Sequence, residues 1–377
     1  MTTGTTVRHY RTGQPWRVCF RDGAVERLEP CDQSPNDSLI LAPALFDIQV
    51  NGFAGVDFNS GTLQAEDVRQ ATRALTRYGV AHFLPTVVTG PPDRMRMIVQ
   101  VIVEARQRYP EVSRAVNGVH VEGPYISGLE GARGAHNPRW VRAPDEAEFT
   151  ALQEAAAGLV SLVTLAPEVD GALAFIRRRV AEGIVVAIGH TSAGEKEILA
   201  AVEAGARLST HLGNGCASML PRHENPITVQ LGQDELMASF IADGHHLPPY
   251  LLKSLIRAKE VGRSILTTDC MAAAGAPPGR YRLADLELEV GEDRVVRQPG
   301  QSNFAGSALT LDRAVANTAR WCGVSLADAI DMASLHPARL FAPNASFTPS
   351  ASSDFILATA SPAFAIDTTV RAGTRLS

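Results

Sequence analysis

The chain has 377 residues, of which 45% are hydrophobic and 20% are charged. This composition can bury a large core and carries too little charge for an extended disordered chain. The formal net charge is −5, from 35 Lys and Arg against 40 Asp and Glu, without an extended basic run. A nucleic-acid backbone or an anionic membrane would meet net repulsion, and we expect neither as a partner.

The cysteines and the apolar segments bear on the compartment. The five cysteines are odd in number, widely spaced and without a C-x-x-C pair. This argues against a disulfide framework and a zinc knuckle, and it favours a reducing cytoplasm. The first eight residues lack the apolar core of a signal peptide. The best apolar run, residues 39–50, is short and contains Pro43 and Asp47, so we expect no membrane span.

Both ends of the chain have the pattern of short strands. Residues 16–20 and 24–28 flank Arg21-Asp22-Gly23, which is a hairpin turn signal. Residues 355–358 and 368–372 are also strand-like. We therefore expect residues 1–43 and 346–377 to form one small β-sandwich domain from both chain termini.

Residues 44–345 alternate short β-branched runs with amphipathic stretches, the pattern of repeated βα units around parallel strands. The spacing of Ser192 and Glu195 predicts a capping box at the start of one helix. Residues 281–297 resemble a hairpin inserted after the last strand. Eight units predict an α/β fold, a (β/α)8 TIM barrel with its site at the carboxyl ends of the strands. The predicted strands are 45–50, 82–87, 116–121, 161–165, 184–188, 207–210, 237–241 and 264–268.

Several of these strands end in side chains that bind metals or carry protons. Glu122, His190 and His211 follow three different strands, and one carboxylate with two imidazoles suits a divalent ion of the zinc kind. Three protein ligands leave a position for a water, whose pKa the ion lowers to about 7. We assign Asp269, after the last strand, to take and return the proton of this water. One such residue alone is as often a loop cap, but their joint occurrence favours a site.

The motifs around these residues resemble those of one family. Their order and spacing are similar to N-acetylglucosamine-6-phosphate deacetylases of the amidohydrolase superfamily, over residues 43–341. The resemblance implies a distorted (β/α)8 barrel with a small β-sandwich, a homodimer, and removal of the acetyl group from N-acetylglucosamine 6-phosphate to give glucosamine 6-phosphate and acetate. The segments that carry it are FDIQVNG (46–52), GVHVEGP (118–124), GAHNP (134–138), GHTSA (189–193), THL (210–212), ADGHH (242–246), TD (268–269) and AGSALT (305–310).

The resemblance also implies roles for single residues. Glu122, His190 and His211 match metal ligands, Asp269 matches the catalytic acid and base, and His136 matches the residue that polarises the acetyl carbonyl. Many superfamily members hold a second metal with an H-x-H pair after the first strand. Here Gln49 and Asn51 replace that pair, so we expect one divalent ion, zinc. The matches to substrate contacts are Ala135, Asn214, Gly215, Arg222, His246, Phe304, Ala305 and Gly306, with Arg222 matching a phosphate-binding arginine.

One loop departs from the family pattern. Residues 213–221 replace a short stretch of an aromatic residue followed by Asn-Ala-Met, although Asn214 is kept. Arg222, directly after this loop, could instead be a solvated loop charge. The altered loop leaves open a deacetylase of another N-acetyl sugar or N-acyl amide. The sequence is also compatible with a superfamily deaminase or cyclic amidase, and with a non-catalytic scaffold that has lost its metal.

Overall fold

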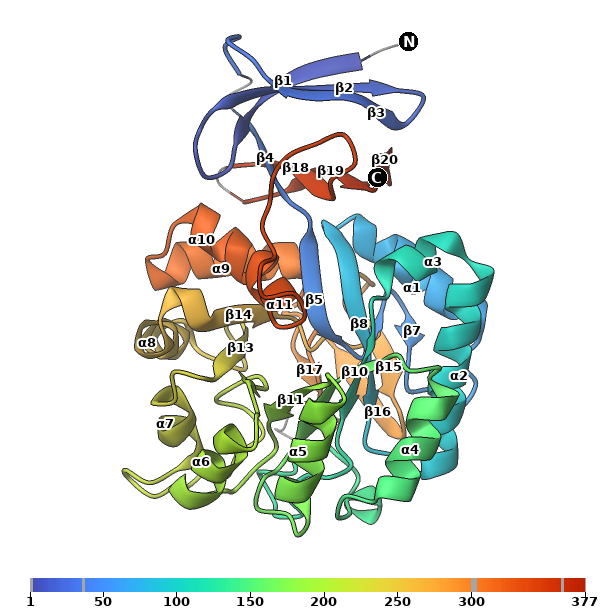
Figure 1. The fold of residues 1–377 in the computed structure, drawn as a ribbon, viewed down its shortest axis with the longest axis vertical. Helices are drawn as coiled ribbons and strands as arrows, with labels where there is room; N and C mark the ends of the chain where they lie inside the picture. Colours follow the sequence, from blue (N-terminus) through green and yellow to red (C-terminus); the bar gives the residue numbers. More distant parts are fainter. Residues whose placement is uncertain (1–2, 36–37, 300–303, 361–362, 377) are drawn as a thin grey trace.

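The computed structural model describes residues 3–35, 38–299, 304–360 and 363–376. Strands from the two chain ends lie together at one end of the molecule, and the other elements form a strand barrel surrounded by helices (Figure 1). The division at residues 43 and 346 stays a prediction, and its ranges include residues outside the described part.

The central sheet contains the eight parallel strands that the sequence predicts, in the order in which they occur along the chain. Most of their residues are buried, because side chains fill the inside of the barrel and helices cover its outside. The predicted TIM barrel is confirmed. The strands are β5 (Leu45–Val50), β8 (Val80–Val88), β9 (Val119–Glu122), β10 (Val160–Leu165), β11 (Val185–Ile188), β12 (Leu208–Ser209), β13 (Met237–Ile241) and β14 (Ser264–Thr267).

The barrel closes irregularly between its first and last strands. A single parallel bridge joins Val50 to Cys270. Side chains supplement it, since the buried carboxylate of Asp47 accepts hydrogen bonds from the hydroxyls of Thr267 and Thr268 at 2.8 and 2.6 Å. These interactions fix the two chain segments that follow β5 and β14, and both segments contribute to the site described below.

Helices cover the outside of the barrel (Figure 1). In α1 the buried residues Val68, Ala71 and Leu75 share one face, and the chain then turns at Gly79, whose φ is +81°. None of the described helices combines the length and apolar character needed to cross a membrane. The helices are α1 (Ala65–Thr76), α2 (Pro92–Arg108), α3 (Pro110–Ala115), α4 (Glu146–Ala155), α5 (Ala172–Ala181), α6 (Glu195–Glu203), α7 (Pro226–Leu231), α8 (Pro249–Lys259), α9 (Leu311–Cys322), α10 (Leu326–Met332) and α11 (Leu335–Arg339), with 3-10 turns η1 (Pro138–Trp140) and η2 (Val261–Arg263).

The predicted cap of α6 is wrong by two residues. The helix starts at Glu195, and the carboxylate of Glu197 accepts a hydrogen bond from the N–H of Gly194 at 3.1 Å. Ser192 does not cap the helix, because its N–H and hydroxyl both donate to Glu168, at 2.7 and 3.0 Å. A carboxylate from another βα loop therefore replaces the local interaction that the spacing predicts.

The strands of the two chain ends form one sheet, so the prediction that both termini build the small β unit is confirmed. The predicted hairpin at residues 21–23 joins β2 to β3, with positive φ at Asp22 and Gly23. The sheet also closes, because β1 pairs in parallel with β4. In order around the sheet, the strands are β1 (Thr3–His9), β2 (Pro15–Arg21), β3 (Ala24–Pro30), β20 (Thr374–Arg375), β19 (Ile366–Arg371), β18 (Phe355–Thr359) and β4 (Leu39–Pro43).

The predicted insertion after the last barrel strand is also present. It is a three-stranded antiparallel sheet of β15 (Gly279–Leu283), β16 (Leu286–Val290) and β17 (Val296–Arg297). A smaller hairpin of β6 (Gly52–Phe53) and β7 (Val56–Asp57) follows the first barrel strand.

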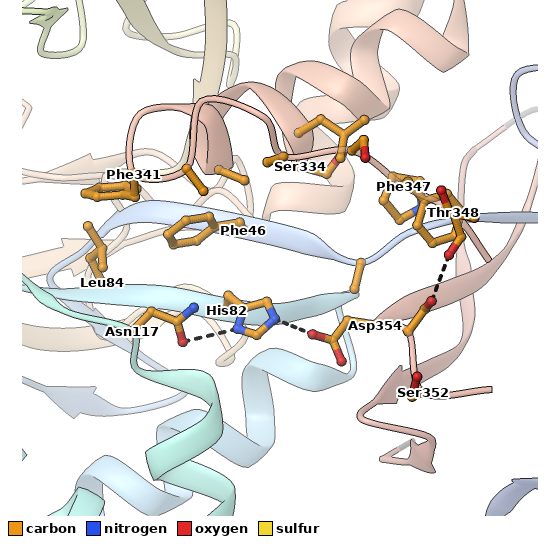
Figure 2. Close-up of a pocket in the computed structure, with 18 of the residues that line it drawn as sticks. Phe46, His82, Leu84, Asn117, Ser334, Phe341, Phe347, Thr348, Ser352 and Asp354 are labelled. Carbon is orange, nitrogen blue, oxygen red and sulfur yellow. Dashed lines mark hydrogen bonds and ion pairs between the residues drawn. The ribbon is translucent and has the colours of Figure 1, made fainter. Parts of the chain in front are cut away.

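A cavity of about 490 Å³ lies at the amino ends of the barrel strands, next to the terminal sheet. Figure 2 shows Phe46 and Phe341 at one end of it and His82 close to Asp354 at the other. His82 Nε2 lies 2.7 Å from Asp354 Oδ2, and Ala372 N donates to Asp354 Oδ1 at 2.6 Å. This contact ties the barrel to the terminal sheet, at the end opposite the site.

Candidate active site

The predicted site residues stand where the barrel strands end. Glu122 is the last residue of β9, and His190, His211 and Asp269 each come within two residues of a strand end. The last three have positive φ values of 50°, 30° and 48°. Such backbone is uncommon outside glycine and is concentrated at functional sites. The structure therefore brings the four residues to one end of the barrel. The surrounding fold must hold the backbone of His190, His211 and Asp269 in its unusual conformation.

Three donor atoms form a tight triangle. Glu122 Oε1 lies 3.1 Å from His190 Nε2 and 2.9 Å from His211 Nε2, and the two imidazole nitrogens are 3.2 Å apart. Ligands of a tetrahedral zinc ion are about 3.3 Å from one another at ordinary bond lengths. The spacing of these three atoms therefore fits one small divalent cation.

The tautomer of His190 supports the same conclusion. Its Nδ1 lies 3.0 Å from the carbonyl oxygen of Ala132, which can only accept a hydrogen bond. Nδ1 therefore carries a proton, and in the neutral ring Nε2 presents a lone pair to the Glu122 carboxylate. Two lone pairs at this distance repel unless a cation lies between them. The donor set thus fits a metal, and the carbonyl of Ala132 orients the ring.

Contacts within the cluster determine which of its groups are ionised. Burial alone would raise the pKa of Glu122, but contacts with His190 and His211 hold it well below its ordinary value. Burial lowers the pKa of His211, yet its contact with the Glu122 carboxylate raises it overall. Glu122 is therefore ionised, as a metal ligand must be.

Two amides hold the Asp269 carboxylate. Gln49 Nε2 donates to both Glu122 Oε1 and Asp269 Oδ1, at 2.9 Å each, and Asn51 Nδ2 donates to Asp269 Oδ1 at 2.7 Å. Burial, followed by the negative charge of Glu122, raises the pKa of Asp269 to about 7. A group with this pKa can both gain and lose a proton at neutral pH. Gln49 thus links the two carboxylates, and Asn51 engages Asp269 alone, at the positions that the resemblance matches to the H-x-H pair.

His136 borders the metal-type cluster. Its Nε2 lies 3.3 Å from His190 Nε2, and its Nδ1 lies 2.8 Å from the hydroxyl of Thr89. Glu122, His136 and His190 also have donor atoms within 4.8 Å of one another, which makes them a second candidate ligand set. His211 contacts two members of the triangle directly, whereas His136 contacts His190 alone in hydrogen-bonding range.

A cavity of about 1070 Å³ opens over this cluster. Glycine is required in its wall, because a Cβ on Gly215 would lie 2.9 Å from His190 Nδ1. Arg222 is exposed and is not among the residues that line the cavity. The lining residues that sequence reasoning missed include Thr89, Arg94 and Arg133. The predicted residues that do line it are Asn51, Glu122, Ala135, His136, His190, His211, Asn214, Gly215, His246, Asp269, Phe304, Ala305 and Gly306.

Comparison with known proteins gives a consistent result, although no family model matches the chain. It is 34% identical over 346 residues to the N-acetylgalactosamine-6-phosphate deacetylase of Escherichia coli O157:H7, covering 90% of each chain. It is 32% identical over 346 residues to the N-acetylglucosamine-6-phosphate deacetylase of Danio rerio, covering 89% of this chain and 82% of the other. The chain belongs to the N-acetylglucosamine-6-phosphate deacetylase family.

The solved structures agree with this membership. The crystal structure of N-acetyl-D-glucosamine-6-phosphate deacetylase from Mycobacterium smegmatis matches with a TM-score of 0.87 and 27% identity, over 100% of both chains. A mutant of that enzyme in complex with N-acetyl-D-glucosamine-6-phosphate matches with a TM-score of 0.84. As a member of this deacetylase family, the chain is a metal-dependent amidohydrolase that acts on a linear amide.

Proposed function

We propose that this chain removes the acetyl group of N-acetylglucosamine 6-phosphate and releases glucosamine 6-phosphate and acetate. The observation that carries the proposal is the arrangement of Glu122, His190 and His211 around one point, with Asp269 and His136 beside it in the same cavity. The names and coverage of the relatives support the substrate class.

Glu122, His190 and His211 would hold one divalent ion, which we propose to be zinc because one carboxylate and two imidazoles suit it. When bound, the ion supplies Lewis-acid activation of water and of the substrate carbonyl. The amides of Gln49 and Asn51 occupy the positions of the second metal's ligands and engage the carboxylates, which supports a single-metal site.

The protein's own groups move the protons. Asp269 accepts the proton of the attacking water at Oδ2, because Gln49 and Asn51 hold Oδ1, and it then returns the proton to the departing amine. Burial lowers the pKa of His136 to about 3, so its ring is neutral at pH 7. His136 Nδ1 is hydrogen-bonded to the hydroxyl of Thr89, and in the Nε2–H tautomer the ring donates to the carbonyl oxygen as negative charge develops there.

The setting of the enzyme follows from its surface and its thiols. All five cysteines are free, which supports a reducing cytoplasm.

We also propose a homodimer, because Leu129 and Met219 are 62% and 89% exposed on two loops whose neighbouring residues line the cavity.

A second candidate substrate is N-acetylgalactosamine 6-phosphate, which differs at one sugar hydroxyl. It is favoured by the 34% identity to a relative with that name. The test is acetate release from N-acetylglucosamine, N-acetylgalactosamine and N-acetylmannosamine, each with and without a 6-phosphate. A preference for the glucosamine phosphate supports the proposal, and a preference for the galactosamine phosphate replaces it with this second candidate.

The role of Asp269 is tested with the substrate that the wild type prefers. Asp269→Asn keeps the shape but cannot take a proton, so kcat should fall by about 10²–10⁴-fold. Metal content should not change, because Asp269 is outside the ligand triangle. Asp234→Asn, an exposed acid, is the matched control. Undiminished acetate release by Asp269→Asn would overturn the assignment.

A further inference from the structure

A carboxylate from the loop after β10 holds the two residues that follow His190. Glu168 Oε2 accepts a hydrogen bond from the hydroxyl of Thr191 at 2.6 Å. Glu168 Oε1 accepts two more, from the N–H and the hydroxyl of Ser192 at 2.7 and 3.0 Å. Hydrogen bonds to an ionised acceptor are roughly twice as strong as those between neutral groups. Both carboxylate oxygens of Glu168 thus bind one short segment of the neighbouring loop.

These hydrogen bonds serve neither the substrate cavity nor the start of a helix. Glu168 is not among the residues that line the active-site cavity. The first turn of α6 has its own cap, because Glu197 accepts a hydrogen bond from the N–H of Gly194. Glu168 can therefore influence the site only through the backbone that it holds.

The backbone of His190 needs such support. Its φ of +50° is uncommon for a residue other than glycine, and such a conformation persists only where the surrounding structure enforces it. Before His190, an added Cβ on Gly189 would lie 2.7 Å from Thr164 Cγ2, so the chain is tightly packed there. At His190 itself, the carbonyl oxygen accepts a hydrogen bond from Ser127 N at 2.9 Å. Glu168 supplies the restraint on the side that follows.

The same contacts join the loops of two proposed metal ligands. Ser127 lies on the loop that follows Glu122, and its Oγ is 3.2 Å from the Oγ of Ser192 on the loop that follows His190. The strands β9, β10 and β11, which precede these loops and the loop of Glu168, are neighbours in the barrel. A shift of the His190 backbone would change the distance of 3.1 Å between its Nε2 and Glu122 Oε1. The geometry of the ligand pair therefore depends on Glu168.

We propose that Glu168 is a positioning residue that fixes His190 for metal binding. The inference rests on the proposed function, since it takes His190 as a ligand of the ion. Glu168 acts through the backbone of residues 190–192, because the ring of His190 already has its own partner in the carbonyl oxygen of Ala132. Loss of a group that orients a metal ligand typically weakens metal binding 10–100-fold.

The test measures the dissociation constant of zinc by competition with a chromogenic chelator. Glu168→Ala should raise this constant at least tenfold, because all three hydrogen bonds are lost. Glu168→Gln should give a smaller rise, since the amide keeps one acceptor oxygen but its nitrogen cannot accept from Ser192 N–H. The matched control is Asp170→Asn, an exposed acid on the same loop, which should stay within twofold of the wild type.

A second variant removes one of the three hydrogen bonds and keeps Glu168. Thr191→Val lacks the hydroxyl that donates to Glu168 Oε2, so it should also weaken zinc binding, by less than Glu168→Ala does. Its effect should largely disappear in the double variant with Glu168→Ala, because the shared hydrogen bond is already absent there. Fully additive effects would show that the two residues do not act together, and would overturn the inference.

A purely structural role predicts a different result. It would lower the melting temperature of the metal-free protein and leave the zinc affinity of the folded protein unchanged, and this outcome overturns the inference. If Glu168→Ala does not fold, unchanged zinc affinity in both Glu168→Gln and Thr191→Val overturns it as well. The measurement needs no substrate, so it does not depend on which acetylated sugar is cleaved. A wild type that binds no zinc would instead overturn the proposed function on which the inference rests.

Discussion

At the scale of single residues, the structure leaves two histidines next to the same metal-type donors. His136 and His211 both lie near His190, at 3.3 and 3.2 Å between Nε2 atoms. Only His211 also reaches Glu122 Oε1 at 2.9 Å in the hydrogen bonds described. A ligand must face the other ligands across the ion, whereas a carbonyl-polarising group stands to one side. The geometry therefore favours His211 as the ligand and His136 as the polarising group.

The two histidines should respond differently to truncation. His211→Ala removes one of three ligands, so the purified protein should retain less than a tenth of an equivalent of zinc. His136→Ala should keep close to one equivalent and lose about 10²–10³-fold in kcat, as expected for the loss of one donor to a developing oxyanion. Metal analysis after dialysis, together with acetate release, measures both quantities. The reverse pattern of metal loss would show that the ligand set is wrong.

The sequence predicts the identity of these residues better than their contacts. Glu122, His190, His211 and Asp269 can be predicted because strand ends of a barrel meet at one rim. Gln49 is a different case, since the sequence shows only that a metal-binding histidine is absent. Its bridge between two carboxylates depends on distances of 2.9 Å that arise from the closure of the barrel. Such contacts between strands far apart in the chain have no local sequence signal.

At the scale of elements, the eight barrel strands follow from their β-branched runs, but their boundaries and caps do not. The start of α6 differs from its prediction because Glu168 takes the donors of Ser192. The end of α7 has a similar long-range partner. Lys259, which is 1% exposed at the end of α8, donates through Nζ to the carbonyl oxygens of Gln230 and Gln233 at 3.0 and 2.6 Å. A buried ammonium thus caps a neighbouring helix.

The cap by Lys259 predicts a dependence of stability on pH. Burial, followed by the positive charge of Arg263, lowers the pKa of Lys259 from 10.5 to about 8. Between pH 8 and 10.5 the unfolded chain therefore binds more protons than the folded chain, so the free energy of unfolding rises with pH in this window. Lys259→Met should lower it by about 1–3 kcal/mol at pH 7, because two carbonyls lose a donor.

Urea unfolding at pH 7 and at pH 10 measures this effect. The difference in unfolding free energy between wild type and Lys259→Met should widen at pH 10, because only the wild type gains stability there. Lys253→Met, on the same helix, is the control and should show a difference that does not depend on pH. A constant difference for Lys259→Met would mean that its pKa is not lowered in the fold.

At the scale of the whole molecule, the sequence predicts the barrel and the pairing of the two chain ends. It does not predict that the terminal sheet closes through β1 and β4, because no local pattern specifies which strands become neighbours. The contact between the barrel and the terminal sheet also joins residues that are far apart in the chain. Asp354 precedes β18 and contacts His82 on β8 in the wall of the cavity at the amino ends of the strands (Figure 2). This contact lies at the opposite end of the barrel from the cluster of Glu122, His190 and His211.

The contact of Asp354 should stabilise the fold without affecting catalysis. Burial alone would raise the pKa of Asp354, but its contact with His82 lowers it overall. A carboxyl whose pKa is lower in the folded chain contributes stability above its unfolded pKa of about 3.9 and loses it as the pH falls through the folded value. Asp354→Asn should therefore cost about 1 kcal/mol at pH 7 and less at a pH below the folded pKa of Asp354. Asp367→Asn, an exposed acid of the same sheet, is the control. Equal losses of unfolding free energy at the two pH values would contradict this account, because the charge of Asp354 would then not act through His82. A fall in kcat for Asp354→Asn would also contradict it, because the contact would then affect the opposite end of the barrel.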